Sequence, residues 1–204
     1  MSSLKFLCVW LLTLAGAGCS FCMLPPYRVH DGYDGMSKSG AVLGAVLESE
    51  DIVELKKLQI SGMIERSPYT WLLIAAPWCP YAMKDWEKIS MEDAALSRLG
   101  VNTMIVFADY RLRFISSQKR KYDYRKGVFV LDNIDFGDST WKKTEKLLQE
   151  LDVQSIASEK YPIHLLFDSE QNLIFSAVGT VKDPMEVVRN LESDGDLRIG
   201  SLRY

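Results

Sequence analysis

The sequence predicts an α/β domain in which helices flank a central mixed β-sheet. Residues 69–76 form a continuous apolar run of strand length, which is typical of a strand buried on both faces of a partly parallel sheet. Helix-like and strand-like segments alternate after this run. Near the C-terminus, two strand-like runs flank a short turn, which indicates an antiparallel pair. Together these observations predict parallel and antiparallel neighbours in one sheet.

The remaining elements follow from the spacing of apolar residues along the chain. Residues 49–64 are predicted to form a helix, in which Glu50 and Asp51 would place acidic side chains in the first turn. A second helix is expected to begin near Tyr81, to break near Ser90 and to end at Gly100. Strands are then expected over residues 102–108, 128–131, 163–167 and 173–178, and helices over residues 140–151 and 184–191.

The composition is that of an ordinary folded protein. The chain has 204 residues, of which 48% are apolar and 25% are charged, so it can form one well-buried domain with extensions. Its formal net charge of -3 gives no reason to expect a nucleic acid as partner. We expect no cofactor either.

The N-terminus has the features of a signal peptide over residues 1–18. Lys5 precedes an apolar stretch, and small residues lead to Cys19. The stretch is shorter than the roughly 20 residues that a membrane-spanning helix needs. Its end, Leu14-Ala-Gly-Ala-Gly-Cys19, resembles a bacterial lipobox, and this implies lipidation at Cys19. We therefore expect a membrane-anchored lipoprotein of the bacterial cell envelope that faces the periplasm. Cleavage after Ala17, which would give a soluble secreted or periplasmic protein, is the alternative.

The mature chain is expected to consist of a tether, one domain and a tail. Residues 19–48 contain prolines and glycines and little periodicity, as a linker does. Residues 49–195 would form the domain and residues 196–204 the tail. Without acylation, Cys19 and Cys22 would make a C-x-x-C pair, and the role of Cys22 stays open. In an oxidising compartment an unpaired thiol such as Cys79 requires an explanation.

A basic stretch with interleaved aromatic residues lies between the predicted strands at residues 102–108 and 128–131. Asp123 is its one acidic residue. We interpret the stretch as a solvated face of a helix or loop, with a contact to a membrane surface or a partner as the alternative. The basic residues are Arg111, Arg113, Lys119, Arg120, Lys121, Arg125 and Lys126.

Cys79 is the main candidate for chemistry. It follows a buried strand and stands where a helix begins, so backbone N–H groups and the helix dipole favour its thiolate. Pro80 suits the first turn of that helix, where its missing N–H would have no partner. Trp78 can shield one side of the sulfur. We therefore expect Cys79 to be a nucleophile.

Two segments resemble the thioredoxin superfamily: Trp78-Cys-Pro-Tyr81 after an apolar strand, and Tyr161-Pro-Ile-His164 before a hairpin and a final helix. The resemblance implies a thioredoxin-like fold with an insertion between the active-site unit and the cis-proline hairpin. It also implies that Pro162 is cis and lies against the sulfur of Cys79. Tyr161 would offer backbone groups to an extended substrate, beside Trp78, Pro80 and Tyr81.

The sequence departs from the family at two positions that matter for chemistry. Ala82 stands where the family has its second, resolving cysteine, and Leu73 stands where thioredoxins carry a buried acid. A single nucleophile remains, which could form a mixed disulfide with protein thiols and be released by a thiol from outside.

Two alternatives to this monothiol hypothesis stay open. In the first, the fold persists without redox turnover and binds extended protein segments. In the second, Cys79, Met83 and His164 bind Cu(I), since thiolate, thioether and imidazole suit that ion. This ligand set resembles that of Sco-type copper assembly proteins, which are also thioredoxin-like but use two cysteines with a distant histidine.

Overall fold

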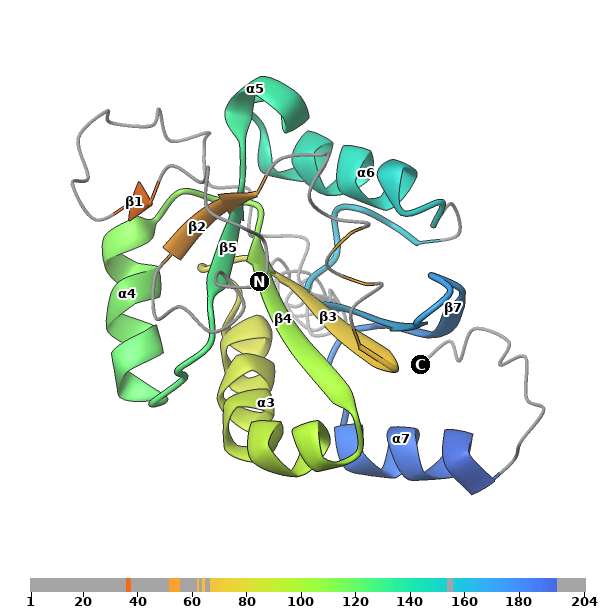
Figure 1. Cartoon of the computed structure of the whole chain (residues 1–204). Helices are drawn as coiled ribbons and strands as arrows, with labels where there is room; N and C mark the ends of the chain where they lie inside the picture. The colour runs from red at the N-terminus through yellow and green to blue at the C-terminus, as the bar shows by residue number, and fades with distance from the viewer. Residues whose placement is uncertain are drawn as a thin grey trace, which may run out of the picture.

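The computed structural model describes residues 36–37, 52–55, 67–153 and 156–193, together with Gly62 and Ile64. The predicted signal peptide, the predicted lipidation at Cys19 and the predicted tail lie outside these residues. A mixed sheet of seven strands in the order β1-β2-β5-β4-β3-β6-β7 forms the centre of the described chain (Figure 1).

The helices and strands have the following bounds. The strands are β1 (Met36–Ser37), β2 (Ile52–Leu55), β3 (Tyr69–Ala75), β4 (Val101–Phe107), β5 (Val128–Leu131), β6 (Ile163–Asp168) and β7 (Leu173–Val178). The helices are α3 (Pro80–Arg98), α4 (Leu112–Lys121), α5 (Asn133–Phe136), α6 (Thr140–Glu150) and α7 (Pro184–Ser193).

Strand β3 lies between a parallel and an antiparallel neighbour. It pairs parallel with β4 on one side and antiparallel with β6 on the other, and β6 pairs antiparallel with β7. Beyond β4, strands β5, β2 and β1 continue the sheet in parallel. All residues of β3 except Tyr69 are buried, as the apolar run predicts. The prediction of an α/β fold with a mixed sheet is therefore confirmed.

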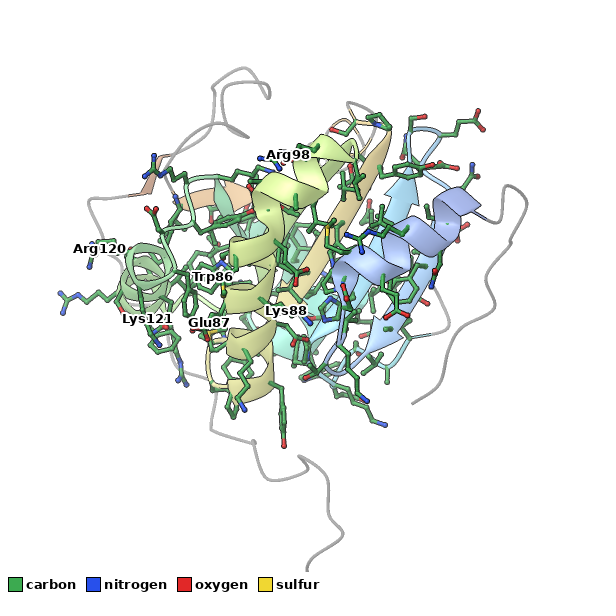
Figure 2. The ribbon with its side chains drawn as sticks, turned by 90° about the horizontal axis from the view of Figure 1, so that it is seen from below. Trp86, Glu87, Lys88, Arg98, Arg120 and Lys121 are labelled. Atoms are coloured by element: carbon green, nitrogen blue, oxygen red, sulfur yellow. The ribbon has the colours of Figure 1, made fainter. Side chains whose placement is uncertain are left out.

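Helices cover both faces of the sheet. Trp71 and Leu73 of β3 pack with α3, α4 and α7, whereas Leu72 and Ile74 face α5 and α6. This alternation follows from the period of two residues in a strand. Figure 2 shows the first of these faces, where Trp86 lies between α3 and α4.

The basic stretch is divided by helix α4. Figure 2 shows Arg120 and Lys121 on the outer side of this helix, and both are exposed. Lys119 is buried, and Lys126 forms an ion pair of 2.6 Å with Asp93. The prediction of a solvated face therefore holds for only part of the stretch.

The chain between β4 and β6 contains α4, β5, α5 and α6. Strand β5 extends the sheet beyond β4, and α6 covers the face opposite α3. The predicted insertion is therefore an integral part of the sheet and of its second layer.

The prediction of a helix over residues 49–64 is wrong at Ile52–Leu55, which form β2. This segment pairs parallel with β5, and the buried side chains of Ile52 and Leu55 join the core. Glu54 accepts a hydrogen bond of 2.5 Å from the Tyr110 hydroxyl. Adjacent β-branched residues suit a strand, and the neighbouring strand decides the conformation of so short a segment.

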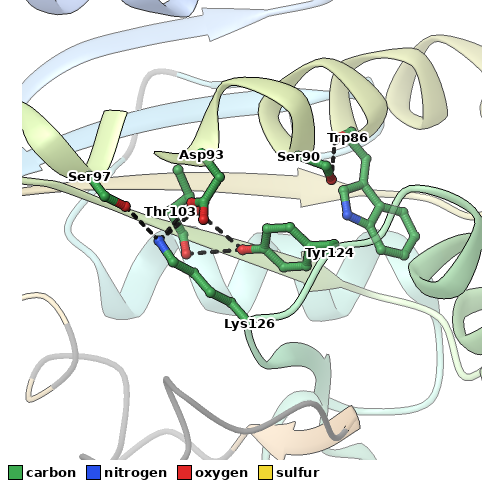
Figure 3. Close-up of polar contacts among 7 residues, drawn as sticks. All are labelled: Trp86, Ser90, Asp93, Ser97, Thr103, Tyr124 and Lys126. Atoms are coloured by element: carbon green, nitrogen blue, oxygen red, sulfur yellow. Dashed lines mark hydrogen bonds and ion pairs between the residues drawn. The ribbon is translucent and has the colours of Figure 1, made fainter. Parts of the chain in front are cut away.

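The predicted break of the second helix near Ser90 is also wrong, since α3 runs unbroken to Arg98. The Ser90 hydroxyl donates to the Trp86 carbonyl at 2.8 Å, within the helix. Asp93 accepts hydrogen bonds from Thr103 and from Lys126, so it links α3 to β4 and the following chain instead of capping a new helix (Figure 3).

Candidate functional site

Cys79 lies at the point where the chain leaves the turn after β3 and enters α3. It is the N-cap residue of α3, and Pro80 occupies the first turn. The Cys79 N–H donates to the Ala76 carbonyl at 2.9 Å, and the Cys79 carbonyl accepts from Met83 at 3.2 Å. These bonds fix the backbone of Cys79, whose side chain is 5% exposed.

The sulfur of Cys79 faces the segment that precedes β6. The Sγ–H donates to the carbonyl oxygen of Tyr161 at 3.5 Å. The Tyr161–Pro162 peptide bond is cis, and the Pro162 carbonyl accepts a hydrogen bond of 2.8 Å from Gly179. Segments 82 residues apart thus meet at the sulfur.

Two aromatic rings and a guanidinium group line the site next to Cys79. The Trp78 ring meets the Tyr161 ring edge to face, with 6.2 Å between ring centres. The Arg111 guanidinium lies 5.4 Å from the centre of the Trp78 ring. Pro80 and Tyr81 are exposed at the start of α3, Tyr81 by 49%. The structure therefore brings Trp78, Tyr161 and Pro162 to Cys79, with Pro80 and Tyr81 beside them.

The side chain of Tyr161 is held by the insertion, a contact that the sequence analysis missed. Its hydroxyl lies 2.6 Å from the Thr144 hydroxyl on α6. Both hydroxyls can donate to the Thr140 carbonyl, Thr144 at 3.1 Å and Tyr161 at 3.5 Å, so either can be the donor in the bond between them. Burial raises the pKa of Tyr161, so the phenol stays protonated.

We expect the Tyr161→Phe variant to open the site to bulky reagents. The bond to Thr144 holds the Tyr161 side chain next to Cys79, and its loss costs about 1 kcal/mol. The population of molecules in which Tyr161 moves away and exposes the sulfur should therefore rise about fivefold. The measurement compares the alkylation rates of Cys79 with a small and a bulky maleimide. The ratio should move toward the bulky reagent in Tyr161→Phe and in Thr144→Val. It should not change in Tyr81→Phe, where the lost hydroxyl belongs to an exposed ring.

A cluster of charged residues around the buried Lys143 and Asp132 lies at the carboxyl ends of β2, β4 and β5. The Lys143 ammonium donates to the Leu131 carbonyl at 2.7 Å and lies 4.1 Å from the centre of the Tyr110 ring. Burial lowers the pKa of Lys143 to about 8, against the opposing charges of Asp109, Asp132, Glu54 and Asp138. Burial also raises the pKa of Asp109, which is 3.4 Å from Arg111.

The structure gives His164 partners other than a metal. Its Nδ1 accepts from the Trp71 indole N–H at 3.2 Å, and its Nε2 lies 2.8 Å from Asp85 Oδ2. Both ring nitrogens are therefore used, and no lone pair remains for copper. These bonds disfavour the candidate Cu(I) set of Cys79, Met83 and His164. In the described part of the chain, no cluster of His, Cys, Asp and Glu side chains is suited to hold a metal ion.

One signal in the sequence could have revealed the buried Asp85. It lies between Met83 and Trp86 on the apolar face of α3, where a carboxylate needs a buried partner. No comparable signal identifies Lys143 as buried, because the adjacent Lys142 of α6 has the same side chain and is exposed.

These features define a thioredoxin-like fold. A cysteine precedes the helix that follows the central strand β3. A cis-proline faces this cysteine at the start of β6, the antiparallel neighbour of β3.

No family model and no curated protein matches the chain. Among the residues that the structure describes, no helix combines the length and apolar character needed to span a membrane.

Several solved structures are similar to this chain. One is the thioredoxin domain of a thiol-disulfide oxidoreductase from Bacteroides vulgatus, with a TM-score of 0.45, 12% identity, and coverage of 65% of this chain and 82% of that chain. StoA from Bacillus subtilis has a TM-score of 0.41 and 14% identity, with coverage of 63% and 82%. A secreted Mycobacterium tuberculosis disulfide oxidoreductase homologous to E. coli DsbE has a TM-score of 0.43 and 12% identity, with coverage of 62% and 81%. These TM-scores are too low to carry an argument. The fold assignment rests on the order of the strands and on Cys79 facing the cis Pro162 segment.

Proposed function

We propose that this protein carries out thiol-disulfide exchange through Cys79 alone and captures protein substrates as mixed disulfides. The observation that carries the proposal is the position of Cys79 at the start of α3, where its sulfur faces the cis Tyr161–Pro162 segment. A helix N-terminus favours the thiolate, which is the attacking species.

The proposed reaction begins with a disulfide in the substrate protein. The Cys79 thiolate attacks one sulfur, a Cys79–substrate S–S bond forms, and the substrate S–S bond breaks to release a thiolate. A thiol from a second molecule then attacks the mixed disulfide and releases Cys79 as a thiolate. Ala82 cannot perform this second step, so the adduct should be long-lived.

The neighbouring residues would position the substrate chain. Backbone groups of Tyr161, next to the cis Pro162, would bind an extended segment beside the sulfur. The rings of Trp78 and Tyr161 offer it apolar contact, and the exposed Pro80 and Tyr81 extend the surface along α3.

We further propose that the protein acts on the periplasmic side of a bacterial cell envelope, anchored by a lipid on Cys19. The leader over residues 1–18 and the lipobox-like run before Cys19 support this location. An oxidising compartment also supplies the substrate disulfides that the reaction requires.

The test of the proposed function is adduct formation with disulfide-containing proteins. The wild type should form adducts that dithiothreitol releases, and Cys79→Ser should form none. Cys22→Ser serves as the matched control, because it removes another cysteine and should leave adduct formation unchanged. Equal recovery of partners by wild type and Cys79→Ser, without adducts, would exclude the thiol chemistry.

A second candidate is a binding module for extended protein segments without redox turnover. The low exposure of Cys79, 5%, and the presence of Ala82 in place of a resolving cysteine favour it. In that case Cys79→Ser should bind the same segments with unchanged affinity. Iodoacetamide should then react with Cys79 no faster than with an ordinary thiol, whose pKa is near 8.5.

A further inference from the structure

A buried hydrogen-bond network lies behind the candidate site. His164 is 0% exposed and Asp85 is 2% exposed. The Trp71 indole can only donate, so His164 Nδ1 accepts and Nε2 carries the proton that it donates to Asp85. Asp85 Oδ2 also accepts from the Val181 N–H at 3.4 Å.

The bonds of Asp85 join the two halves of the site. Asp85 belongs to α3, whose N-cap residue is Cys79. His164 follows Pro162 by two residues on β6. Val181 follows Gly179, whose N–H donates to the Pro162 carbonyl. Each bond to Asp85 thus connects the helix that carries the sulfur to a segment that holds the cis-proline.

A buried polar pair such as Asp85 and His164 is weak evidence for a role in stability alone. Replacing a buried ion or polar pair with apolar residues of similar volume is often neutral or stabilising. Apolar contacts leave a helix free to shift slightly, whereas a hydrogen bond fixes distance and direction. The side chains around Asp85 on α3, such as Ala82, Met83 and Ile89, are apolar. The bond from His164 is therefore a directional contact between α3 and β6.

We propose that Asp85 and His164 are positioning residues for Cys79, holding its sulfur against the Tyr161 carbonyl. The proposal rests on the proposed function, since it assigns these residues to the same site. The Sγ–H donates to the Tyr161 oxygen, and such a bond stabilises the neutral thiol. When this link is lost, the bond from the Sγ–H to Tyr161 lengthens, and Cys79 should be alkylated faster near neutral pH.

The experiment measures the alkylation rate of Cys79 against pH in four variants, with urea unfolding alongside. His164→Leu breaks the link between α3 and β6, whereas His164→Gln can still donate to Asp85 and accept from Trp71. Trp71→Phe is the matched control, since it removes a buried hydrogen bond within the sheet and leaves the link intact. The double variant Asp85→Leu with His164→Leu removes the link while keeping an apolar core, in case His164→Leu does not fold.

The expected result is a rate profile of Cys79 alkylation displaced toward lower pH in His164→Leu and in the double variant, and a wild-type profile in His164→Gln and Trp71→Phe. Identical profiles in all variants would overturn the positioning role even if stability falls. A shift of equal size in Trp71→Phe would overturn it too, because general loosening would then explain the effect. Failure of the proposed function is distinct, since it would appear as an absence of adducts in the wild type. Hydrogen exchange of the Met83 amide, which donates to the Cys79 carbonyl, reports on the start of α3 in the same variants without using the thiol.

Discussion

An Ala82→Cys variant is expected to convert Cys79 into half of a dithiol pair. Position 82 lies on the first turn of α3, buried in the same core cluster as Cys79. Residues three apart at a helix start have Cα atoms within the range of roughly 4.4–6.8 Å that a disulfide spans. The new thiol should attack the mixed disulfide from within the molecule. The lifetime of the adduct should fall on the order of 100-fold.

Mass spectrometry can follow this reaction with oxidised glutathione as the substrate disulfide. The wild type should accumulate a glutathione adduct, whereas Ala82→Cys should lose glutathione and end as an internal disulfide. Ala94→Cys is the control, because it adds an exposed cysteine to the same helix at a distance from Cys79. An adduct that persists equally in both variants would show that position 82 does not reach the sulfur.

The buried Lys143 is expected to make the folded protein more stable as the pH rises from about 7 to about 10. The pKa of Lys143 is about 8 in the folded protein, against an ordinary value of 10.5. Between these values the unfolded chain binds more protons than the folded chain, so the free energy of unfolding rises with pH. The stabilisation from deprotonated Lys143 is complete above about pH 10.5, and it is lost as the pH falls through about 8. Its size over this range is about 2–3 kcal/mol.

Urea unfolding of wild type and Lys143→Met at several pH values checks this expectation. The difference in free energy between the two proteins should change with pH in favour of the wild type. Contributions from the buried tyrosines largely cancel in this difference, because both proteins contain them. Lys142→Met, which replaces the neighbouring exposed lysine, should follow the wild-type curve. A pH-independent difference for Lys143→Met would show that Lys143 does not titrate in this range.

The strands around Cys79 could be predicted from the sequence because their residues are apolar on both faces. Strand β3 and its neighbours β4 and β6 lie within one or two residues of the predicted bounds. Strand β2 could not be predicted in the same way, because four residues carry little periodicity and β5, far along the chain, determines their conformation. The break predicted at Ser90 failed because the serine bonds within its own helix.

The candidate site was predictable in its backbone and much less so in its side chains. Cys79 and Pro162 stand at positions that follow from strand order and from the family resemblance. The contact between Thr144 and Tyr161 and the bond between Asp85 and His164 join residues that are 17 and 79 positions apart. Polar pairs of this kind depend on how layers pack, and a single sequence carries no pattern for them.

During synthesis, Cys79 is made well before the segment that covers its sulfur in the folded protein. The chain that supplies the carbonyl next to the sulfur is made 82 residues later, and contacts over such separations form more slowly than a local helix. A nascent chain therefore carries α3 with its thiol open to any oxidant. The time that β6 takes to dock on β3 should determine what fraction of newly made molecules is oxidised before the fold can shield them.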